Sequence, residues 1–327
     1  MKEIEDSLQN YFKGQHAETY DGGLYRALKP KLVANHIFPK PKNLVLDGIE
    51  YLKFQHRLQE IARLPKGLNL ALCLMVEVNV ALGILLHSET ETAIKLRERI
   101  TLGNFILGTA VSETGWEGSL NKLSSVLTPD LKLTGTKSFI TNGGSADAVL
   151  WVAPMNGKFF VYYVDLKKHS FCLKYEHIHT SFLKYVSHIK LTAERCPLEQ
   201  TDLVYDNYKK LGIELRLKEL FSLVSLLLGY VETIPKFSAD ESLFSEWNLL
   251  KVWRDQTCQG LTPDTYMSNL EGAFPFPIDG LLGALANYYK IEDPRDLGKR
   301  NPDLSIFLWE DHFTQYLLLR KTRSKRY

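Results

Sequence analysis

The chain has 327 residues, of which 45% are hydrophobic and 24% are charged, and this composition indicates neither disorder nor a fibrous repeat. Because a single hydrophobic core does not keep growing to this length, two or three domains are expected. The 40 lysine and arginine residues nearly balance the 38 aspartate and glutamate residues, which argues against the broad basic face that nucleic-acid binding requires.

The cysteines and the N-terminus bear on the cellular compartment. Cys73, Cys172, Cys196 and Cys258 are scattered without a C-x-x-C pair, so their spacing predicts neither a zinc site nor a redox pair. Free thiols in a reducing compartment are expected. The first residues are acidic where a signal peptide would have basic residues and an apolar run. We therefore expect a cytoplasmic protein.

Residues 1–105 are predicted to form an N-terminal helical domain. Apolar residues recur at helical spacing over residues 49–64. The run 68–86 is apolar enough to raise the question of a membrane span, but Glu77 and Asn79 lie at its centre, where a charge in a bilayer is costly. A buried core helix is expected there, and no membrane span.

The pattern changes from helical to strand-like at about residue 106. Just before the change, Ser88 is placed to cap a charged helix over residues 89–100. Residues 106–205 contain short runs rich in Val, Thr, Tyr and Phe, separated by turn residues, and such runs predict a central antiparallel β-sheet or small barrel. The runs cover residues 148–153, 159–164, 171–175 and 185–191.

Residues 206–327 are predicted to form a C-terminal helical bundle. The segment 211–231 is apolar around most of its circumference, as the core helix of a bundle would be. Residues 281–289 and 306–319 also have a helical pattern, and prolines between the helices prevent a long continuous one. The fold class is therefore α+β and multidomain, in the order helical, β, helical.

Two segments of the β region carry residues suited to a bound cofactor. Ser112 and Glu113 end a strand and lead into a glycine-containing turn that finishes at Gly118 and Ser119, where backbone N–H groups and hydroxyls can meet a ring edge or a phosphate. The second segment, 133–144, ends in residues 139–144, which offer an aromatic face, a hydroxyl and a tight Asn-Gly-Gly turn. Taken singly, each piece usually means only a strand followed by a turn.

In order and spacing, the pair resembles the flavin-binding strands of the acyl-CoA dehydrogenase family. That family has a Thr-Glu-Pro-x-Ala-Gly-Ser-Asp segment followed by Gly-x-Lys-x-Trp/Phe-Ile-Thr-Asn-Gly, and the second is almost complete here at residues 135–143. The resemblance covers roughly residues 50–230 and implies the family's helical, β and helical domains. It implies FAD as the cofactor.

The resemblance also implies roles for individual residues. Ser112 stands where the family threonine hydrogen-bonds the flavin ring edge, and Gly118 with Ser119 stands beside the FAD pyrophosphate and the acyl-CoA. Phe139 would pack against the isoalloxazine, and Thr141 would hydrogen-bond its reactive edge. The implied activity is that of an FAD-dependent oxidoreductase of fatty acid metabolism, which desaturates an acyl thioester between its α and β carbons.

In this chemistry a carboxylate removes the α-proton while the β-hydride goes to the flavin. The family base lies in a Tyr-Glu-Gly-Thr-x-Gln segment, and the nearest counterpart here contains Glu310. Some family members place the base on the first long C-terminal helix, where Glu214 and Glu219 are available. No metal is expected, because His177 and His179 lack a third ligand at a fixed spacing.

The implied partners are an acyl-CoA or an acyl-carrier-protein thioester, an electron-transfer flavoprotein, and further copies of the chain in a homodimer or tetramer. The chain also departs from the family pattern. The first segment lacks the proline and has Leu120 where an aspartate is usual. The C-terminal domain is truncated and lacks the Arg-x-x-Phe-Gly and Gln-x-x-Gly-Gly segments. Two alternatives therefore stay open: a non-catalytic homologue that has lost FAD or the base and acts as a binding or hetero-oligomer subunit, and a flavin monooxygenase or nitroalkane-oxidising relative.

Overall fold

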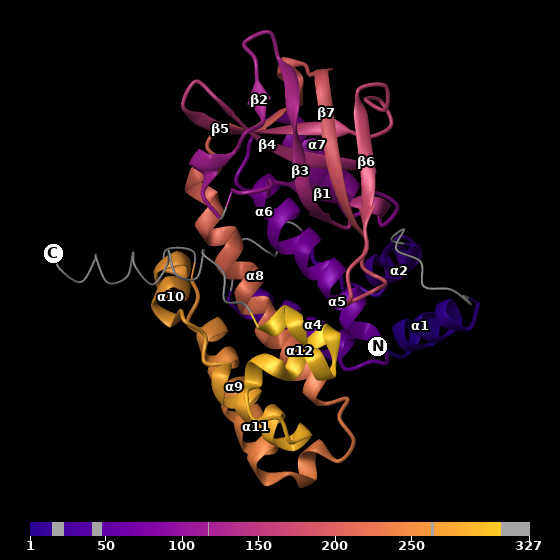
Figure 1. The fold of residues 1–327 in the computed structure, drawn as a ribbon, viewed down its shortest axis with the longest axis vertical. Helices are drawn as coiled ribbons and strands as arrows, with labels where there is room; N and C mark the ends of the chain where they lie inside the picture. Colours follow the sequence, from indigo (N-terminus) through magenta and orange to yellow (C-terminus); the bar gives the residue numbers. More distant parts are fainter. Residues whose placement is uncertain (15–22, 41–47, 117, 263–264, 309–327) are drawn as a thin grey trace, which may run out of the picture.

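The structure, a computed structural model, describes residues 1–14, 23–40, 48–116, 118–262 and 265–308. Helices come first, strands follow, and helices complete the described chain (Figure 1). The strands lie at one end of the molecule, and the long helix α8 runs from them to the opposite end. Glu310 and residues 309–319 of the predicted helix 306–319 lie outside the described residues.

The N-terminal part is helical, as predicted. The segment 49–64 lies largely within α4, and the apolar run forms one continuous helical stretch from Gly67 to Leu86 with a π-helical turn in its middle. This stretch is long and apolar enough to cross a membrane, yet 94% of its apolar window is buried inside the protein, which confirms the prediction of a buried core helix. The elements are α1 (Lys2–Gly14), α2 (Gly23–Ala34), α4 (Gly48–Ala62), α5 (Gly67–Val76), the π-turn η1 (Glu77–Leu82), α6 (Gly83–Leu86) and α7 (Glu91–Ile100).

The prediction that Ser88 caps the charged helix is wrong. Helix α7 begins two residues later than expected, and the side chain of Thr90 caps it by accepting a hydrogen bond from the N–H of Ala93. The Ser88 hydroxyl instead donates to the carbonyl of Val204, and this contact attaches the start of the helix to a strand. Both residues are good cap formers, so only the tertiary contact decides between them.

Within the described residues, eight strands form two four-stranded sheets, with the orders β1-β4-β5-β8 and β2-β3-β7-β6. Every described pairing is antiparallel except that of β1 with β4, which is parallel and starts at Leu107 opposite Ala148. The expectation of a purely antiparallel sheet is thus corrected, because the chain crosses to the second sheet between β1 and β4, as a parallel pair requires. The strands are β1 (Leu107–Ala110), β2 (Val126–Leu127), β3 (Lys132–Thr141), β4 (Ala148–Met155), β5 (Lys158–Asp165), β6 (Leu173–Ile178), β7 (His188–Pro197) and β8 (Leu203–Tyr205).

The expectation of free cysteines holds for two residues and fails for two. Cys73 and Cys258 are free and buried. Cys172 and Cys196 form a disulfide, with their Cα atoms 5.3 Å apart. The antiparallel pairing of β6 with β7 begins at Leu173 opposite Ala193 and brings the two cysteines together. Their separation in sequence gives no sign of this pairing.

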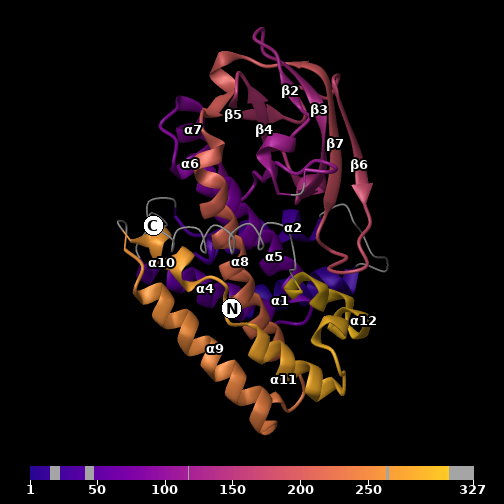
Figure 2. The ribbon, with the colours of Figure 1, turned by 60° about the vertical axis from the view of Figure 1, so that its left-hand side comes forward.

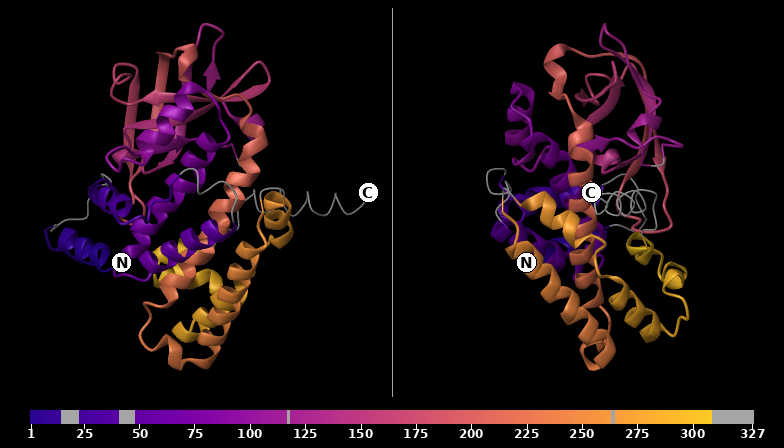
Figure 3. Two further views of the ribbon diagram at one scale, coloured as in Figure 1. Left: turned by 180° about the vertical axis from the view of Figure 1, so that it is seen from behind. Right: turned by 90° about the vertical axis from the view of Figure 1, so that its left-hand side faces the viewer.

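The C-terminal part is built around α8, which contains the predicted core helix. Helices α9 and α11 lie beside the half of α8 that is distant from the sheets (Figure 2). Views from behind and from the side show the sheets at the opposite end of the molecule from these two helices (Figure 3). Proline-containing segments separate the short helices, as expected. The helices are α8 (Tyr208–Val231), α9 (Glu241–Gln259), α10 (Tyr266–Ala273), α11 (Asp279–Tyr289) and α12 (Leu297–Arg300).

Strand β4 connects the two apolar cores. Leu150 and Val152 belong to the large cluster that fills the helical part of the molecule. Val149 and Trp151 belong to a second cluster between the two sheets. Successive side chains of a strand point to opposite faces, so β4 is buried on both sides. The β region is therefore held firmly against the helices.

A buried ion pair joins the helical part to the first strand. Glu77, in the π-turn, accepts hydrogen bonds from Lys29 Nζ at 2.8 Å and from Tyr25 OH at 2.6 Å. It also accepts one from the N–H of Leu107 at 2.8 Å, at the start of β1. The side chains of Lys29 and Glu77 have no solvent exposure. A buried charge persists only with such partners, which explains a glutamate at the centre of an apolar helix.

The crossing of α8 with α4 generates a test of packing. At Gly229 an added Cβ would overlap the carbonyl oxygen of Gln59 and lie 2.8 Å from the Cβ of Ala62. Gly229→Ala is expected to lower the free energy of unfolding by about 1–3 kcal/mol, as overpacking does. Gly212→Ala in the same helix is the matched control, since its added Cβ would meet only Tyr208 at 3.5 Å. The control should be neutral or stabilising by about 0.5–1 kcal/mol. Urea unfolding measures both, and equal effects would contradict this packing.

Candidate functional site

The fold brings the two signature segments into contact. The chain leaves β1 through Ser112, and the second segment occupies the end of β3. The N–H of Ser138 donates to the carbonyl of Ser112 at 2.8 Å, so the first segment lies along β3. Phe139 is 38% exposed and Thr141 is half-buried. Three of the five predicted cofactor residues thus lie around one short stretch of β3.

A buried ion pair holds this contact in place. Glu113 Oε1 lies 2.7 Å from Lys137 Nζ, and the two side chains are 1% and 0% exposed. The carboxylate also accepts hydrogen bonds from Ser124 N–H and from Ser125 N–H, at 2.5 and 3.1 Å, and from both serine hydroxyls. Lys137 Nζ donates further to the carbonyl of Val111 at 3.1 Å. Both ions are therefore fully partnered.

The electrostatics of the pair follow from burial and mutual attraction. Burial lowers the pKa of Lys137 to about 8, against the opposing effect of the carboxylate. Burial alone would raise the pKa of Glu113, but Lys137 and the serines outweigh it and the pKa is lowered. Both groups stay charged at neutral pH, and removing one partner of such a pair typically costs about 3–5 kcal/mol. Both residues lie within the two signature segments, but the sequence pattern alone does not predict that they pair.

A histidine outside both signature segments lies beside the predicted flavin residues. His188, the first residue of β7, is the cross-strand partner of Thr141. Its ring stacks on Phe139 with the centroids 4.3 Å apart and an interplanar angle of 28°. The residue is 2% exposed, and neither ring nitrogen has a hydrogen-bond partner. Burial lowers its pKa to about 4, so the imidazole is neutral at pH 7.

The two remaining cofactor residues lie in the loop between β1 and β2. Gly118 has a φ of 75°, a left-handed conformation that favours glycine. The N–H of Ser119 donates to the carbonyl of Trp116 at 2.8 Å, and the carbonyl of Ser119 accepts from the N–H of Lys122 at 2.9 Å. The loop is thus a hydrogen-bonded turn. Its role beside a pyrophosphate stays a prediction.

The candidate catalytic carboxylates have different surroundings. Glu310 lies outside the described residues. Glu214, on α8, has a side chain that is 9% exposed and accepts hydrogen bonds from Lys218 Nζ at 2.5 Å and from His87 Nε2 at 3.1 Å. Burial alone would raise the pKa of Glu214, but these partners lower it to about 2. Glu219 Oε2 lies 3.6 Å from Nη1 of Arg216. A carboxylate as acidic as Glu214 is a weak base at neutral pH.

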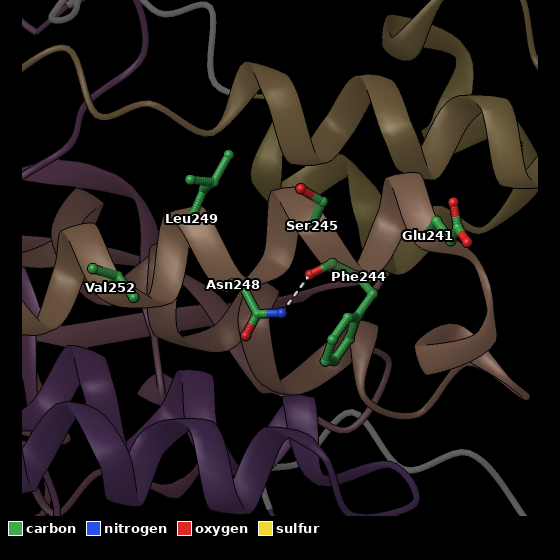
Figure 4. Close-up of a pocket in the computed structure, with 6 residues that line it drawn as sticks. All are labelled: Glu241, Phe244, Ser245, Asn248, Leu249 and Val252. Carbon is green, nitrogen blue, oxygen red and sulfur yellow. Dashed lines mark hydrogen bonds between the residues drawn. The ribbon is translucent and has the colours of Figure 1, made fainter.

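A surface depression on the outer side of α9 is separate from this cluster. Its lining residues share one face of the helix (Figure 4), namely Glu241, Phe244, Ser245, Asn248, Leu249 and Val252. None of them belongs to either signature segment.

The described parts of the chain contain no group of three His, Cys, Asp or Glu side chains that could hold a metal ion. His177 lies in β6, and the ring of Tyr175 packs edge-on against its ring.

Comparison with known proteins identifies the fold. No family model and no curated protein matches the sequence. Among solved structures, butyryl-CoA dehydrogenase from Megasphaera elsdenii is 12% identical with a TM-score of 0.69, over 96% of this chain and 90% of that one. The FAD complex of PigA is 14% identical, with a TM-score of 0.73 over 98% and 94%. The prolyl acyl carrier protein oxidase AnaB is 16% identical, with a TM-score of 0.66 over 98% and 97%. The chain has the acyl-CoA dehydrogenase fold, which confirms at the level of fold the resemblance of the two segments.

The ion pairs of Glu214 generate a pH prediction. Its pKa is about 2 in the folded protein and 4.5 ordinarily, so the unfolded chain takes up the proton first as pH falls. The stabilisation is therefore complete above pH 4.5 and is lost between pH 4.5 and about 2; for one group shifted this far it amounts to at most about 3 kcal/mol.

Glu214→Gln should accordingly be less stable than the wild type by a constant margin from pH 7 to 5, and the margin should narrow below pH 4.5. Denaturant unfolding at a series of pH values measures it. Glu91→Gln is the control, because Glu91 pairs with Lys95 on the surface, where an ion pair contributes little. A margin that does not vary with pH would contradict the buried ion pairs of Glu214.

Proposed function

We propose that the chain is an FAD-dependent oxidoreductase that desaturates an acyl thioester between its α and β carbons. The observation that carries the proposal is the cluster at the end of β3. The partly exposed aromatic ring of Phe139 lies near the hydroxyl-bearing Thr141 on β3. Ser112 lies alongside, because its carbonyl accepts a hydrogen bond from the N–H of Ser138, the residue before Phe139. The unpartnered imidazole of His188 lies against the same ring. A flat ring with polar edges, such as a flavin, fits this combination.

The residues of the chain would have distinct tasks. Phe139 would bind one face of the flavin ring, and the hydroxyls of Ser112 and Thr141 would donate hydrogen bonds to its edge. The Glu113–Lys137 pair would keep the two segments in register, since it is buried and fully partnered. Bound FAD supplies the hydride acceptor. The preorganised donors would make the flavin edge more electron-accepting, as fixed dipoles do when they face developing negative charge.

The catalytic base is proposed to be Glu310. Of the carboxylates on α8, Glu214 is buried in ion pairs and strongly acidic. Glu219 pairs with Arg216. Removing an α-proton needs a base with a pKa nearer to neutrality, which favours a carboxylate outside these pairs.

The substrate is proposed to be a thioester of coenzyme A or of a carrier protein, with an electron-transfer flavoprotein as the electron acceptor. Similar solved structures include both a butyryl-CoA dehydrogenase and a prolyl acyl carrier protein oxidase. A flavoprotein monooxygenase is separated from this activity by steady hydrogen peroxide release or by a hydroxylated product.

A non-catalytic role is the second candidate. The engagement of both described carboxylates of α8 in ion pairs favours it. In that case the protein would bind partners and leave acyl thioesters unchanged. The anaerobic spectrum of the FAD-loaded protein with butyryl-CoA and longer acyl-CoA thioesters separates the two. Bleaching of the flavin band supports catalysis, and a flavin that stays oxidised with every thioester supports the second role.

A homo-oligomer is also proposed, with α9 as the contact. Phe244, Leu249 and Val252 are 38%, 62% and 53% exposed on the outer face of this helix. If two copies of α9 pack antiparallel about a twofold axis between residues 246 and 247, Phe244 of one copy meets Leu249 of the other. Ser245 then meets Asn248 at the centre, where short side chains allow close approach. Such a self-complementary face is what a twofold interface requires.

Flavin binding is the first prediction of this proposal. Purified wild-type protein incubated with excess FAD and freed of unbound cofactor should keep a flavin absorption band. Phe139→Ala should raise the dissociation constant for FAD by about tenfold, the effect of losing one aromatic stacking contact. Phe171→Ala removes a phenylalanine that is 74% exposed elsewhere in the β region and should leave the constant unchanged. Equal losses in the two variants would speak against a flavin at Phe139.

The oligomer gives a second prediction. Wild-type protein should sediment as a dimer or a larger species. Leu249→Glu should sediment as a monomer, because the dimer would bury two carboxylates against apolar side chains. The variant should still unfold cooperatively on heating, which shows that the monomer is folded. Leu102→Glu, at a residue 67% exposed outside α9, is the control and should keep the wild-type mass. A wild-type protein that is monomeric at micromolar concentration would refute the contact.

A further inference from the structure

Buried polar atoms without hydrogen-bond partners gather at one end of the β3–β7 ladder. Both ring nitrogens of His188, the hydroxyl of Ser187 and the side-chain oxygen of Asn142 are among the buried atoms for which the described structure provides no partner. The three residues are neighbours, because the N–H of Asn142 donates to the carbonyl of Ser187 at 2.8 Å and His188 pairs with Thr141. The remaining residues with such atoms are dispersed over other elements.

His188 is the residue of this group that lies against the proposed flavin site. It is on the same side of the sheet as Thr141, its cross-strand partner, since directly opposed residues share a face. Its ring stacks on Phe139, whose own ring is partly exposed. Asn142 differs, because its amide nitrogen donates to the carbonyl of Cys73 in α5, away from the flavin residues.

A buried imidazole with neither nitrogen bonded needs an explanation. Leaving a buried donor or acceptor unpaired is unfavourable, and native proteins avoid it unless water or a ligand satisfies the group or the group has a functional task. A leucine or phenylalanine would fill the same space without this penalty. The neutral imidazole has one donor and one acceptor nitrogen, so it can pair with a group that accepts and a group that donates.

We propose that His188 is a further contact residue for the flavin, and that its imidazole hydrogen-bonds the polar edge of the ring that stacks on Phe139. The inference rests on the proposed function, because it takes the ligand of Phe139 and Thr141 to be FAD. Because Phe139 stacks on His188, the contact requires its partly exposed side chain to rotate away from the edge of the imidazole when the flavin binds. The donor and acceptor atoms along the pyrimidine edge of a flavin complement the two imidazole nitrogens. Neither signature segment includes this residue.

The test separates a ligand contact from a packing residue. In His188→Leu both nitrogens are removed and a buried apolar side chain remains. The melting temperature of the FAD-free variant should equal or exceed that of the wild type, because two unsatisfied atoms are gone. Its dissociation constant for FAD, measured by quenching of flavin fluorescence, should rise by about tenfold, the effect of one lost hydrogen bond. His188→Asn, which keeps a donor and an acceptor on a shorter side chain, should have an intermediate constant.

Trp151→Phe is the matched control. Trp151 also has a buried ring nitrogen without a partner, but it belongs to the apolar cluster between the two sheets. Its replacement removes an unsatisfied buried N–H in the same region, and the constant for FAD should stay within about twofold of the wild-type value, since no ligand hydrogen bond is lost. This control distinguishes a general effect of altering the β region from a specific effect at His188.

The outcomes are distinct. If wild-type protein binds no FAD, the proposed function fails and this inference fails with it. If wild-type protein binds FAD and His188→Leu binds it equally well, only the assignment of His188 is overturned. Should His188→Leu not fold, the ring-nitrogen NMR signals of ¹⁵N-histidine-labelled wild-type protein decide. Added FAD should shift the signal that is missing in His188→Asn, and an unshifted signal overturns the assignment.

Discussion

The ion pair between Glu113 and Lys137 is the constraint on which the candidate site depends. Each residue belongs to one signature segment, and the pair joins them at 2.7 Å, with both side chains buried. Every close partner of the carboxylate is a donor, and the ammonium also reaches the backbone of the first segment. If β3 paired in another register, one of these charges would be buried without its partner. Losing the partner of a buried charge costs far more free energy than losing an ion pair on the surface. The pair therefore selects the one alignment in which Ser112 and Phe139 lie close together.

A second buried carboxylate, Glu77, has the same effect at the boundary between helices and strands. It occupies the π-turn in the apolar helical stretch and accepts hydrogen bonds from Lys29 and from the first residue of β1. The extra residue of a π-turn commonly marks such a local requirement. Through Glu77 the start of β1 is tied to α2 and α5. The Glu113–Lys137 pair ties its end to β3. A four-residue strand of low intrinsic stability is in this way held at both ends.

The helical part combines an apolar core with polar contacts between helices. Gln55 of α4 donates to Ser222 of α8 and accepts from Ser225 of α8, at 2.8 Å in each case. Arg254 of α9, which is fully buried, donates to Gln59 of α4 at 2.6 Å. Contacts of this kind align the helices one against another because an unpaired amide or guanidinium in the core is costly. They leave the outer face of α9 with its apolar side chains exposed.

Periodicity in the sequence was sufficient to predict the order of helical, β and helical parts. It also predicted α4, the buried helical stretch 67–86 and the core of α8. Burial of one face or of all faces of an element leaves a local pattern of apolar residues. The two signature segments were sufficient for the fold and for the choice of Phe139, Thr141 and Ser112 as site candidates. Glu310 lies outside the described residues, so its role stays a prediction. Contacts between distant residues left no local pattern. The parallel pairing of β1 with β4, the disulfide between Cys172 and Cys196, the cap at Thr90 and the place of His188 beside Phe139 each depend on which segments pack together. A residue type states what a side chain can bond with, and only the tertiary structure decides which partner comes within reach.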